Sequence, residues 1–353
     1  MRSYRLNASG MNKIVRRASA IVAGTSAFKG ERVHHGHGFG TTWGVRWAPR
    51  ERRLAAACYA ATLRCGSGKD LQMLKGFTVP RSPLGVAALI PPPPWHFAGE
   101  ALAVEFWNDP DIAADILPNG VELDARRAGH SVALFGDWQF TAQNDEYLDP
   151  ARYQCREFIV LLDATWQGAE IAWCPYAYAD NDAAVARGWI QGYPQKIGTV
   201  HQTRTFAAAS AASAPPVSNG RFAASVSAHG QLLARAQVTL RERADHLVGL
   251  LDRPIVARRH FPRLCAGMHD KPALDELVRC MMGDVLIADI WTGEGDLVFP
   301  EAHGEELEML GPIRVGRGFR FSFSCSVSDS EILADLTAGA PRLEGPPTIR
   351  GKC

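Results

Sequence analysis

The sequence Gly192-Tyr193-Pro194-Gln195-Lys196-Ile197-Gly198 decides how this chain is interpreted. Pro194 fixes the backbone shortly before a lysine, and a short run that ends in a glycine follows. A lysine held in such a turn can be shielded from water, which favours the neutral amine over the ammonium. A neutral amine can attack a ketone and form a Schiff base. The plainer interpretation is a surface lysine in a turn, and on this stretch alone both stay open.

The sequence just before this turn predicts the elements that present it. Arg156 to Thr165 contains a continuous apolar run, and Glu170 to Tyr178 follows it after Gln167-Gly168, so the two segments are predicted to form a hairpin. A helix is predicted over Ala183–Trp189, directly before the turn. The turn is therefore expected to follow a strand and a helix, and the next strand is predicted over Ile197–Phe206.

The rest of the body is also rich in predicted strands. A helix is predicted from Asp109 to Leu117, because Asp109 is a good cap and Pro110 suits the first helical position. Strands or hairpins are predicted over Ala101–Phe106, Ser131–Phe140, Phe222–Leu240, Pro254–Leu264, Leu286–Trp291 and Phe319–Val327, and a second short helix over Glu305–Leu310. Together these elements predict one α+β domain, mostly antiparallel β with few helices, built as a barrel or folded sheet.

The charge of the chain is unevenly distributed. The net charge is +1, but residues 1–72 carry +10 and the remaining residues carry −9. The body is therefore mildly acidic, which argues against nucleic acid as a partner. No run of 18 apolar residues occurs, so no transmembrane helix and no membrane partner are expected.

The cysteines indicate neither a disulfide framework nor a metal site. The eight cysteines lie at positions 58, 65, 155, 174, 265, 280, 325 and 353, with no CxxC pair and no zinc-ligand spacing with histidine. Buried free thiols in a reducing compartment are the expected state, and we expect a cytoplasmic protein without a structural metal.

The two ends of the chain differ from its body. Residues 1–72 are rich in Arg, Gly, Ala, Ser and His with poor periodicity, and we expect them to be disordered or loosely attached. A transit peptide is one interpretation. We favour another, in which translation begins at Met73 and the segment before it is not native. Residues 338–353 are rich in Gly and Pro and are expected to be a loose tail, which leaves a domain over 73–337.

Several familiar motifs are absent from the sequence. It has no GxGxxG, GxxxxGK[ST], HExxH or GxSxG pattern, so nucleotide binding, zinc proteolysis and serine hydrolysis have no support and no cofactor is expected. What remains is Lys196 together with Glu157, which precedes a predicted buried strand. A carboxylate in that position can equally be a solvated strand end or a partner of Arg152 or Arg156.

The order and spacing of these segments resemble the acetoacetate decarboxylase family. The resemblance rests on Glu157, the 180–184 run Asp-Asn-Asp-Ala-Ala, the lysine turn, Arg253-Pro254, and the 289–299 segment that holds Asp-Ile-Trp-Thr-Gly and Leu-Val-Phe. It extends from about Met73 to about Leu336. It implies a cone-shaped antiparallel barrel, an oligomeric assembly and a Schiff-base lyase. In that family the first lysine of a Tyr-Pro-Lys-Lys run forms the imine, the second lowers the first one's pKa, and a glutamate matching Glu157 assists.

This chain departs from that pattern at the nucleophile. Gln195 stands at the position of the first lysine and Lys196 at that of the second, and a glutamine cannot form a Schiff base. Either Lys196 is itself the nucleophile, with Gln195 as a hydrogen-bond donor, or the site binds a small acid without covalent chemistry. A second carboxylate of the family falls on Gln139, and the family's substrate-carboxylate arginine has no counterpart in Ala98-Gly99-Glu100.

We therefore expect a Schiff-base lyase acting on a small keto acid, by decarboxylation of a β-keto acid through an iminium and an enamine. Lys196 is the expected nucleophile, Glu157 the proton shuttle, and Gln195, Gln139 and Tyr193 the substrate-binding residues. An aldolase–dehydratase using the same imine chemistry is one alternative, and a non-catalytic small-molecule-binding protein on the same fold is the other.

Overall fold

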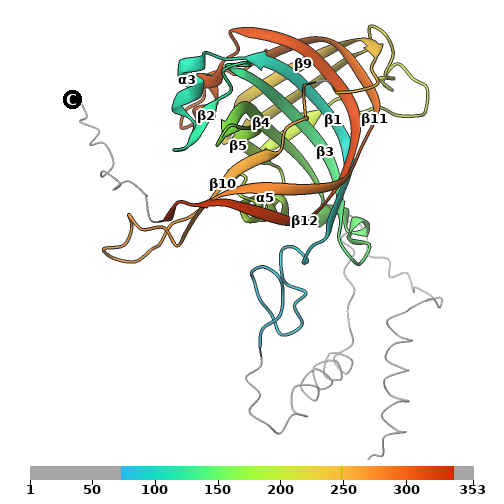
Figure 1. The fold of residues 1–353 in the computed structure, drawn as a ribbon. Coiled ribbons are helices and arrows are strands. Elements are labelled where there is room, and N and C mark those ends of the chain that lie inside the picture. Colours follow the sequence, from blue (N-terminus) through green and yellow to red (C-terminus); the bar gives the residue numbers. More distant parts are fainter. Residues whose placement is uncertain (1–72, 248, 338–353) are drawn as a thin grey trace, which may run out of the picture. The chain divides into compact units, whose positions relative to one another are not determined.

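The computed structural model describes residues 73–247 and 249–337 of the chain. The predictions made for residues 1–72 and for the tail 338–353 lie outside the described residues. The predicted α+β class is confirmed, because the described chain is mostly strand with few helices (Figure 1). Its strands are β1 (Trp95–Trp107), β2 (Val121–Leu123), β3 (His130–Thr141), β4 (Gln154–Trp166), β5 (Ala169–Ala179), β6 (Gln195–Ile197), β7 (Thr199–Gln202), β8 (Arg221–Ala228), β9 (Gln231–Arg243), β10 (Ile255–Phe261), β11 (Leu274–Val298) and β12 (Arg314–Asp335).

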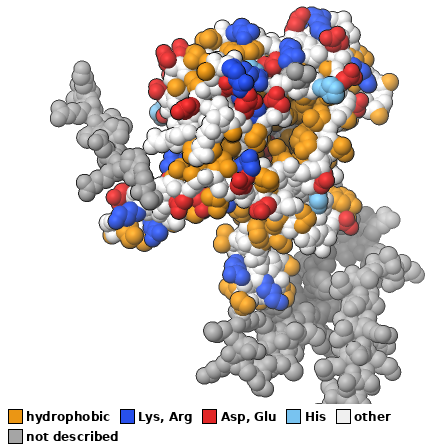
Figure 2. Space-filling model, viewed as in Figure 1, with side chains coloured by type: hydrophobic (Ala, Val, Ile, Leu, Met, Phe, Trp, Pro, Cys, Tyr) orange, Lys and Arg blue, Asp and Glu red, His pale blue; other side chains and the backbone are white. Residues whose placement is uncertain are grey.

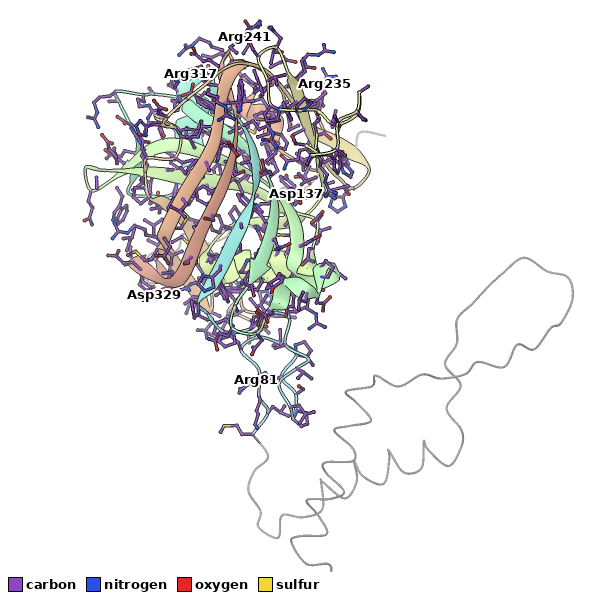
Figure 3. The ribbon with its side chains drawn as sticks, turned by 90° about the vertical axis from the view of Figure 1, so that its right-hand side faces the viewer. Arg81, Asp137, Arg235, Arg241, Arg317 and Asp329 are labelled. Carbon is purple, nitrogen blue, oxygen red and sulfur yellow. The ribbon has the colours of Figure 1, made fainter. Side chains whose placement is uncertain are left out.

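In the described residues these strands form one sheet of 12 strands, in the order β10-β5-β4-β3-β1-β12-β11-β9-β8-β7. β2 adds to β4, and β6 adds to β5. A further pairing joins β10 to β11 and so closes the path from β10 through β12 to β11 into a ring. The two long strands β11 and β12 run along one side of this arrangement, and β12 spans it from Arg317 at one end to Asp329 at the other (Figures 1 and 3).

The helices are short and lie at the ends of strands. They are α3 (Pro110–Asp115), α4 (Pro150–Tyr153), α5 (Asp182–Gln191) and the 3-10 turns η1 (Glu146–Leu148) and η2 (Leu307–Leu310). The predicted cap of α3 is confirmed, since the Asp109 side chain accepts a hydrogen bond from the Asp111 N–H. In α5 the Asn181 side chain caps the first turn, and Gly192 ends the helix at a φ of 91°, a left-handed conformation that glycine adopts without strain.

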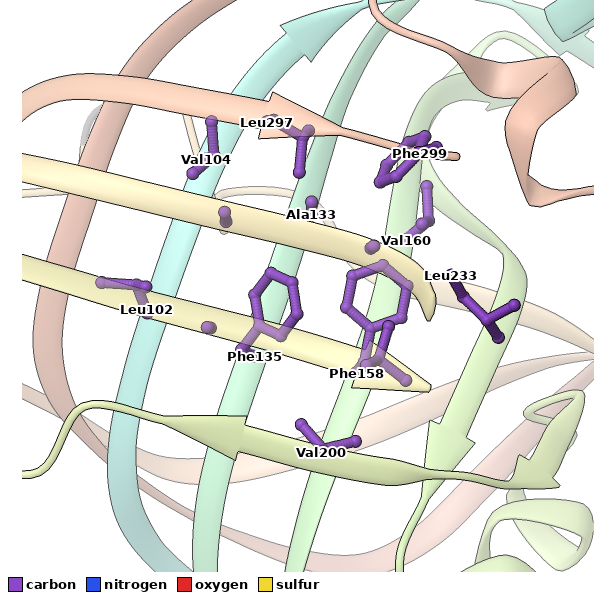
Figure 4. Packing of buried hydrophobic residues seen from close by; sticks show 14 of the residues in the cluster. Leu102, Val104, Ala133, Phe135, Phe158, Val160, Val200, Leu233, Leu297 and Phe299 are labelled. Atoms are coloured by element: carbon purple, nitrogen blue, oxygen red, sulfur yellow. The ribbon is translucent and has the colours of Figure 1, made fainter. Parts of the chain in front are cut away.

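The apolar interior has two main clusters, one on each face of β3 and β4. One contains Phe135, Phe158 and Val160 and lies between β1-β3-β4 and the β8–β9 hairpin, where the two phenyl rings are 4.7 Å apart (Figure 4). The other contains Leu134 and Ile159 and faces β10 and β12. Alternate residues of a strand point to opposite faces, so β4 contributes to both clusters.

Several predicted boundaries were wrong, for identifiable reasons. Of the strand predicted over Ile197–Phe206, only Ile197, the end of β6, and Thr199–Gln202, which form β7, are strand, because the chain changes partner from β5 to β8 around Gly198. The strand predicted over Leu286–Trp291 is the middle of the 25-residue β11. The helix predicted over Glu305–Leu310 is the single 3-10 turn η2.

The described residues before β1, from Met73 on, include a segment that extends away from the strands (Figure 3). It carries Arg81, which lies at the opposite end of the described body from Arg241 (Figure 3). An isolated bridge joins Lys75 to Ser82 in this segment.

Candidate active site

Which residues of β6 belong to the site depends on the face of the strand from which each side chain projects. β6 runs parallel to β5 and pairs Ala177 with Gln195 and Tyr178 with Lys196. Neighbouring residues of a strand point to opposite faces, so Gln195 and Lys196 diverge. Gln195 lies on the face of Ala177, and Lys196 lies on the face of the fully buried Tyr178.

Gln195 and Glu157 meet in the interior. The Gln195 side-chain amide donates a hydrogen bond to Oε1 of Glu157, and Gln195 is only 3% exposed. Glu157 belongs to β4, on the same face as Ile159, and its accessible surface faces a cavity. Burial raises the pKa of Glu157 above the ordinary glutamate value, although the charge of Arg187 and the contacts with Trp138 and Gln195 act in the opposite direction. A carboxyl group with a raised pKa is suited to both accepting and donating a proton.

The cavity around Glu157 has a volume of about 170 Å³. An engineered cavity of about 150 Å³ is large enough to hold benzene, so this one has room for a small organic molecule. Its walls combine a few polar groups with many apolar ones. Its lining residues are Phe97, Leu134, Trp138, Glu157, Ile159, Leu161, Arg187, Gln191, Tyr193, Gln195, Leu251, Arg253, Ile255, Cys280, Met282, Val285, Ile287, Phe321, Phe323, Cys325 and Val327.

Arg187 brings a positive charge to this cavity. It lies on the buried side of α5, is 7% exposed, and its guanidinium lies over the rings of Phe97 and Phe140. Its Nη2 donates to the Cys155 sulfur at 3.7 Å, and among the described residues no carboxylate forms a salt bridge with it. A buried guanidinium in that state is a ready partner for the carboxylate of a ligand.

The helix geometry holds Gln195 against Glu157. The Tyr193 N–H donates to the Gly188 carbonyl at 2.8 Å, which turns the chain back from α5 into β6. The Trp189 indole donates to the Gln195 carbonyl at 2.7 Å. A Cβ at Gly188 would lie 2.8 Å from Cγ of Gln195 and closer still to its amide, so only glycine leaves room for this side chain.

Lys196 lies outside this cavity, in contrast to the predicted shared site with Glu157. Its Nζ donates to Oε2 of Glu305 at 2.5 Å, and its side chain is 46% exposed. The Tyr178 hydroxyl donates to the same oxygen at 2.6 Å. Burial acts to raise the pKa of Glu305, but hydrogen bonds from Lys196 and Tyr178 outweigh it and leave that pKa below its ordinary value. The amine is thus ion-paired and partly exposed to solvent, whereas a Schiff-base lysine was predicted to be shielded from water.

Of the other predicted site residues, Tyr193 lies in the cavity and Gln139 lies outside it. Tyr193 lines the cavity, and burial raises its pKa well above the ordinary tyrosine value, so its phenol stays neutral. Gln139 is exposed, contacts the Gln154 amide at 3.5 Å, and does not line the cavity. The structure therefore brings Glu157, Gln195 and Tyr193 together and leaves Lys196 and Gln139 outside.

Two polar residues that line the cavity from α5 were not predicted as site residues from the sequence. Arg187 and Gln191 lie four residues apart on the buried face of α5, which also carries Ala184 and Gly188. Spacings of three and four residues place all of these on one helix face. Polar side chains on the face that small residues mark as buried were the signal that could have identified them.

The described part of the chain has neither a metal-binding cluster nor a membrane-spanning helix. In residues 73–247 and 249–337 there is no group of three or more His, Cys, Asp or Glu side chains placed to hold a metal ion. Within the same ranges no helix has the length and apolar character needed to cross a membrane.

Comparison with known proteins gives the family. The model of the acetoacetate decarboxylase family matches residues 78–336. No curated protein matches the chain. A solved structure of the enduracididine biosynthesis enzyme MppR, complexed with the condensation product of pyruvate and imidazole 4-carboxaldehyde, shares 36% identity, a TM-score of 0.69, and coverage of 74% of this chain and 97% of that one.

Two further structures agree with this assignment. MppR complexed with pyruvate has 36% identity, a TM-score of 0.69, and coverage of 74% of this chain and 99% of that one. An acetoacetate decarboxylase-like enzyme from Sphingomonas wittichii RW1 has 24% identity and a TM-score of 0.68, covering 74% and 100%, and supports the fold. The chain belongs to the acetoacetate decarboxylase family.

Proposed function

We propose that this protein is an enzyme that binds a small 2-oxo acid in the Glu157 cavity and moves a proton at the carbon next to the carbonyl. Glu157 is the base and Arg187 holds the substrate carboxylate. The observation that carries the proposal is the convergence of three groups in one cavity. They are a carboxyl group with a raised pKa, a hydrogen-bonded amide, and a guanidinium that forms no salt bridge with any described residue.

The chemistry needs no amine. The Glu157 carboxylate takes a proton from the carbon next to the carbonyl, and the C–H electron pair forms an enolate whose negative oxygen the Gln195 amide and Arg187 stabilise. The enolate carbon can then attack an aldehyde, and the protonated Glu157 returns its proton to the new alkoxide. This is an aldol addition, a lyase-type reaction in reverse.

The relatives support a 2-oxo acid as the ligand. One MppR structure is complexed with pyruvate, and another holds a condensation product of pyruvate with an aldehyde. That is a property of MppR, and its identity of 36% with this chain makes the same ligand class the natural first choice. Decarboxylation through an imine finds less support here, because no lysine of residues 73–247 and 249–337 lines the Glu157 cavity.

Exchange of the pyruvate methyl protons in D2O, followed by proton NMR, tests the proposal. We expect the protein to speed the exchange and Glu157→Gln to lose the effect while keeping its fold. Lys196→Met is the matched control and should retain it. A borohydride-reduced pyruvate adduct on Lys196, or loss of exchange in folded Lys196→Met, would refute a mechanism without an imine.

A binding role without turnover is the second candidate. It is favoured by Gln195, which occupies the position where the family has its reactive lysine and which already bonds to Glu157. In that case pyruvate would raise the melting temperature while no proton exchange is seen, and Arg187→Met would abolish the shift.

A further inference from the structure

We infer that the cavity selects 2-oxo acids with an apolar side chain of about four to six carbons, in preference to pyruvate or to a dicarboxylic oxo acid. This rests on the proposed function and adds the substrate class. The inference comes from how polar and apolar groups are distributed along the cavity, from the Glu157 end to the opposite end.

The polar groups gather at one end. These groups come from α5 (Arg187, Gln191), the turn after it (Tyr193), the start of β6 (Gln195) and the first part of β4 (Glu157). A ligand whose carboxylate meets Arg187 and whose carbonyl meets Gln195 therefore has its remaining chain directed along β4, away from α5.

The wall along that direction is apolar. Glu157, Ile159 and Leu161 are successive residues on one face of β4, so the wall continues for about 13 Å beyond the carboxyl group at about 3.3 Å per residue. Leu134 pairs directly with Ile159 on the neighbouring strand, and Phe321 faces them from β12. None of these side chains can bond to a polar tail. Apolar side chains also gather across the middle of the face shown in Figure 2.

The far end offers no free charge. Arg253 lines the cavity there, but its Nη2 is bonded to Asp124 at 2.6 Å, and its Nε lies 3.7 Å from Asp163. Asp163 is the next residue after Leu161 on the same face of β4. The Arg253 nitrogens Nε and Nη1 form no hydrogen bond within the described residues, but each exposes less than 1 Å² of surface, so a ligand cannot reach them. The charge of Arg253 is therefore matched within the protein, and a second carboxylate on the ligand would meet Asp124 and Asp163 as well.

The size of the cavity sets the length of the tail. The methyl group of pyruvate would leave most of the 170 Å³ unfilled. Each buried methylene strengthens binding by about 0.8 kcal/mol, which is about fourfold in the dissociation constant. Affinity should therefore rise about fourfold per methylene from pyruvate to 2-oxohexanoate, and fall once the tail exceeds the cavity.

Isothermal titration calorimetry of the full chain tests this with pyruvate, 2-oxobutanoate, 2-oxopentanoate, 2-oxohexanoate, 4-methyl-2-oxopentanoate and 2-oxoglutarate. We expect stepwise tightening along the unbranched series, and 2-oxoglutarate weaker than 2-oxopentanoate, which has the same chain length. In Leu161→Phe, whose larger ring fills the far part of the cavity, the series should flatten. Thermal melting checks that this variant folds, and Ile255→Phe serves if it does not.

The outcomes separate the two claims. If no oxo acid binds, the proposed function itself fails. If all bind equally, or 2-oxoglutarate binds most tightly, the proposed function stands and the selection of an apolar tail is wrong. Tightening that persists unchanged in a folded Leu161→Phe would also overturn the inference, because the tail would then lie elsewhere.

Discussion

Gly188 gives a direct test of how the Gln195 amide is placed. A Cβ at position 188 would lie 2.8 Å from Cγ of Gln195 and closer to its amide carbon and oxygen. Gln195 is 3% exposed and is held by Glu157 on its other side, so it cannot simply rotate into solvent. Gly188→Ala should therefore push the amide away from Glu157.

The size of the effect on stability follows from one stabilising and two destabilising contributions. Alanine in place of glycine within a helix stabilises by about 1 kcal/mol. Overpacking costs about 1–3 kcal/mol, and losing a hydrogen bond to a charged group costs about 1.5–3 kcal/mol more. Gly188→Ala should therefore lower the free energy of unfolding by about 2–5 kcal/mol.

Removing the Gln195 amide should reverse the sign of the effect that Gly188→Ala has on stability. In Gln195→Ala the amide is gone, so adding Gly188→Ala should stabilise by about 1 kcal/mol, the helix term alone. Urea unfolding of the wild type, both single variants and the double variant measures this cycle. Equal stabilisation by Gly188→Ala in both backgrounds would refute the packing of the amide on Gly188.

The remaining predictions concern charge. Lys196→Met leaves Glu305 with Tyr178 as its partner and should lower the free energy of unfolding by about 1–2 kcal/mol, a modest value because the lysine is half exposed. In a Glu305→Leu background, adding Lys196→Met should cause no such loss. Desolvation lowers the pKa of His130, but hydrogen bonds to two buried carboxylates raise that pKa overall. The contribution of His130 to stability is therefore full below pH 6.5 and is lost as the pH rises through the folded pKa. The pH dependence of chemical unfolding should lose this slope in His130→Asn. Gln195→Lys places an amine beside Glu157, and borohydride with pyruvate should then trap an adduct at that position that the wild type lacks; an unmodified variant would contradict the assignment of the cavity.

The elements around the site could be predicted because their signals are local. The β4–β5 hairpin turns at Gln167 and Gly168, both at positive φ, and α5 begins at its Asn181 cap and ends at Gly192. Each of these features depends on residues within a few positions of one another, which is the range over which sequence patterns operate.

The full length of β11 could not be predicted in the same way. Its first part pairs with β10 and its last part with β9, and its pairing with β12 shifts register at several points. The central residues, among them Met281 and Leu286, are exposed, so the alternation of burial is lost there. Partners distant in the sequence, and not the local pattern, keep this strand continuous.

Which side of β6 faces the cavity could not be predicted from the sequence either. The alternation of Gln195 and Lys196 is a necessary property of a strand, but it does not say which one points to Glu157. The choice is made by β5, where Ala177 and Tyr178 are both fully buried, one on each face. Since both faces of β5 are interior, burial in the sequence pattern cannot distinguish them.

The same parity explains why Lys196 cannot simply take over from the missing lysine. Bringing its amine to Glu157 requires β6 to slide by one residue, which turns Gln195 to the opposite face. The slide would break the hydrogen bond from the Gly198 N–H to the Ala179 carbonyl, 2.9 Å long, and would take the amine from Glu305. Taking the cation from Glu305 costs about 1–2 kcal/mol, because Lys196 is half exposed, and this adds to the cost of the broken backbone hydrogen bond. Adjacent positions in a strand are therefore not interchangeable, and with Gln195 in the cavity the available chemistry is the proton transfer that Glu157 can perform.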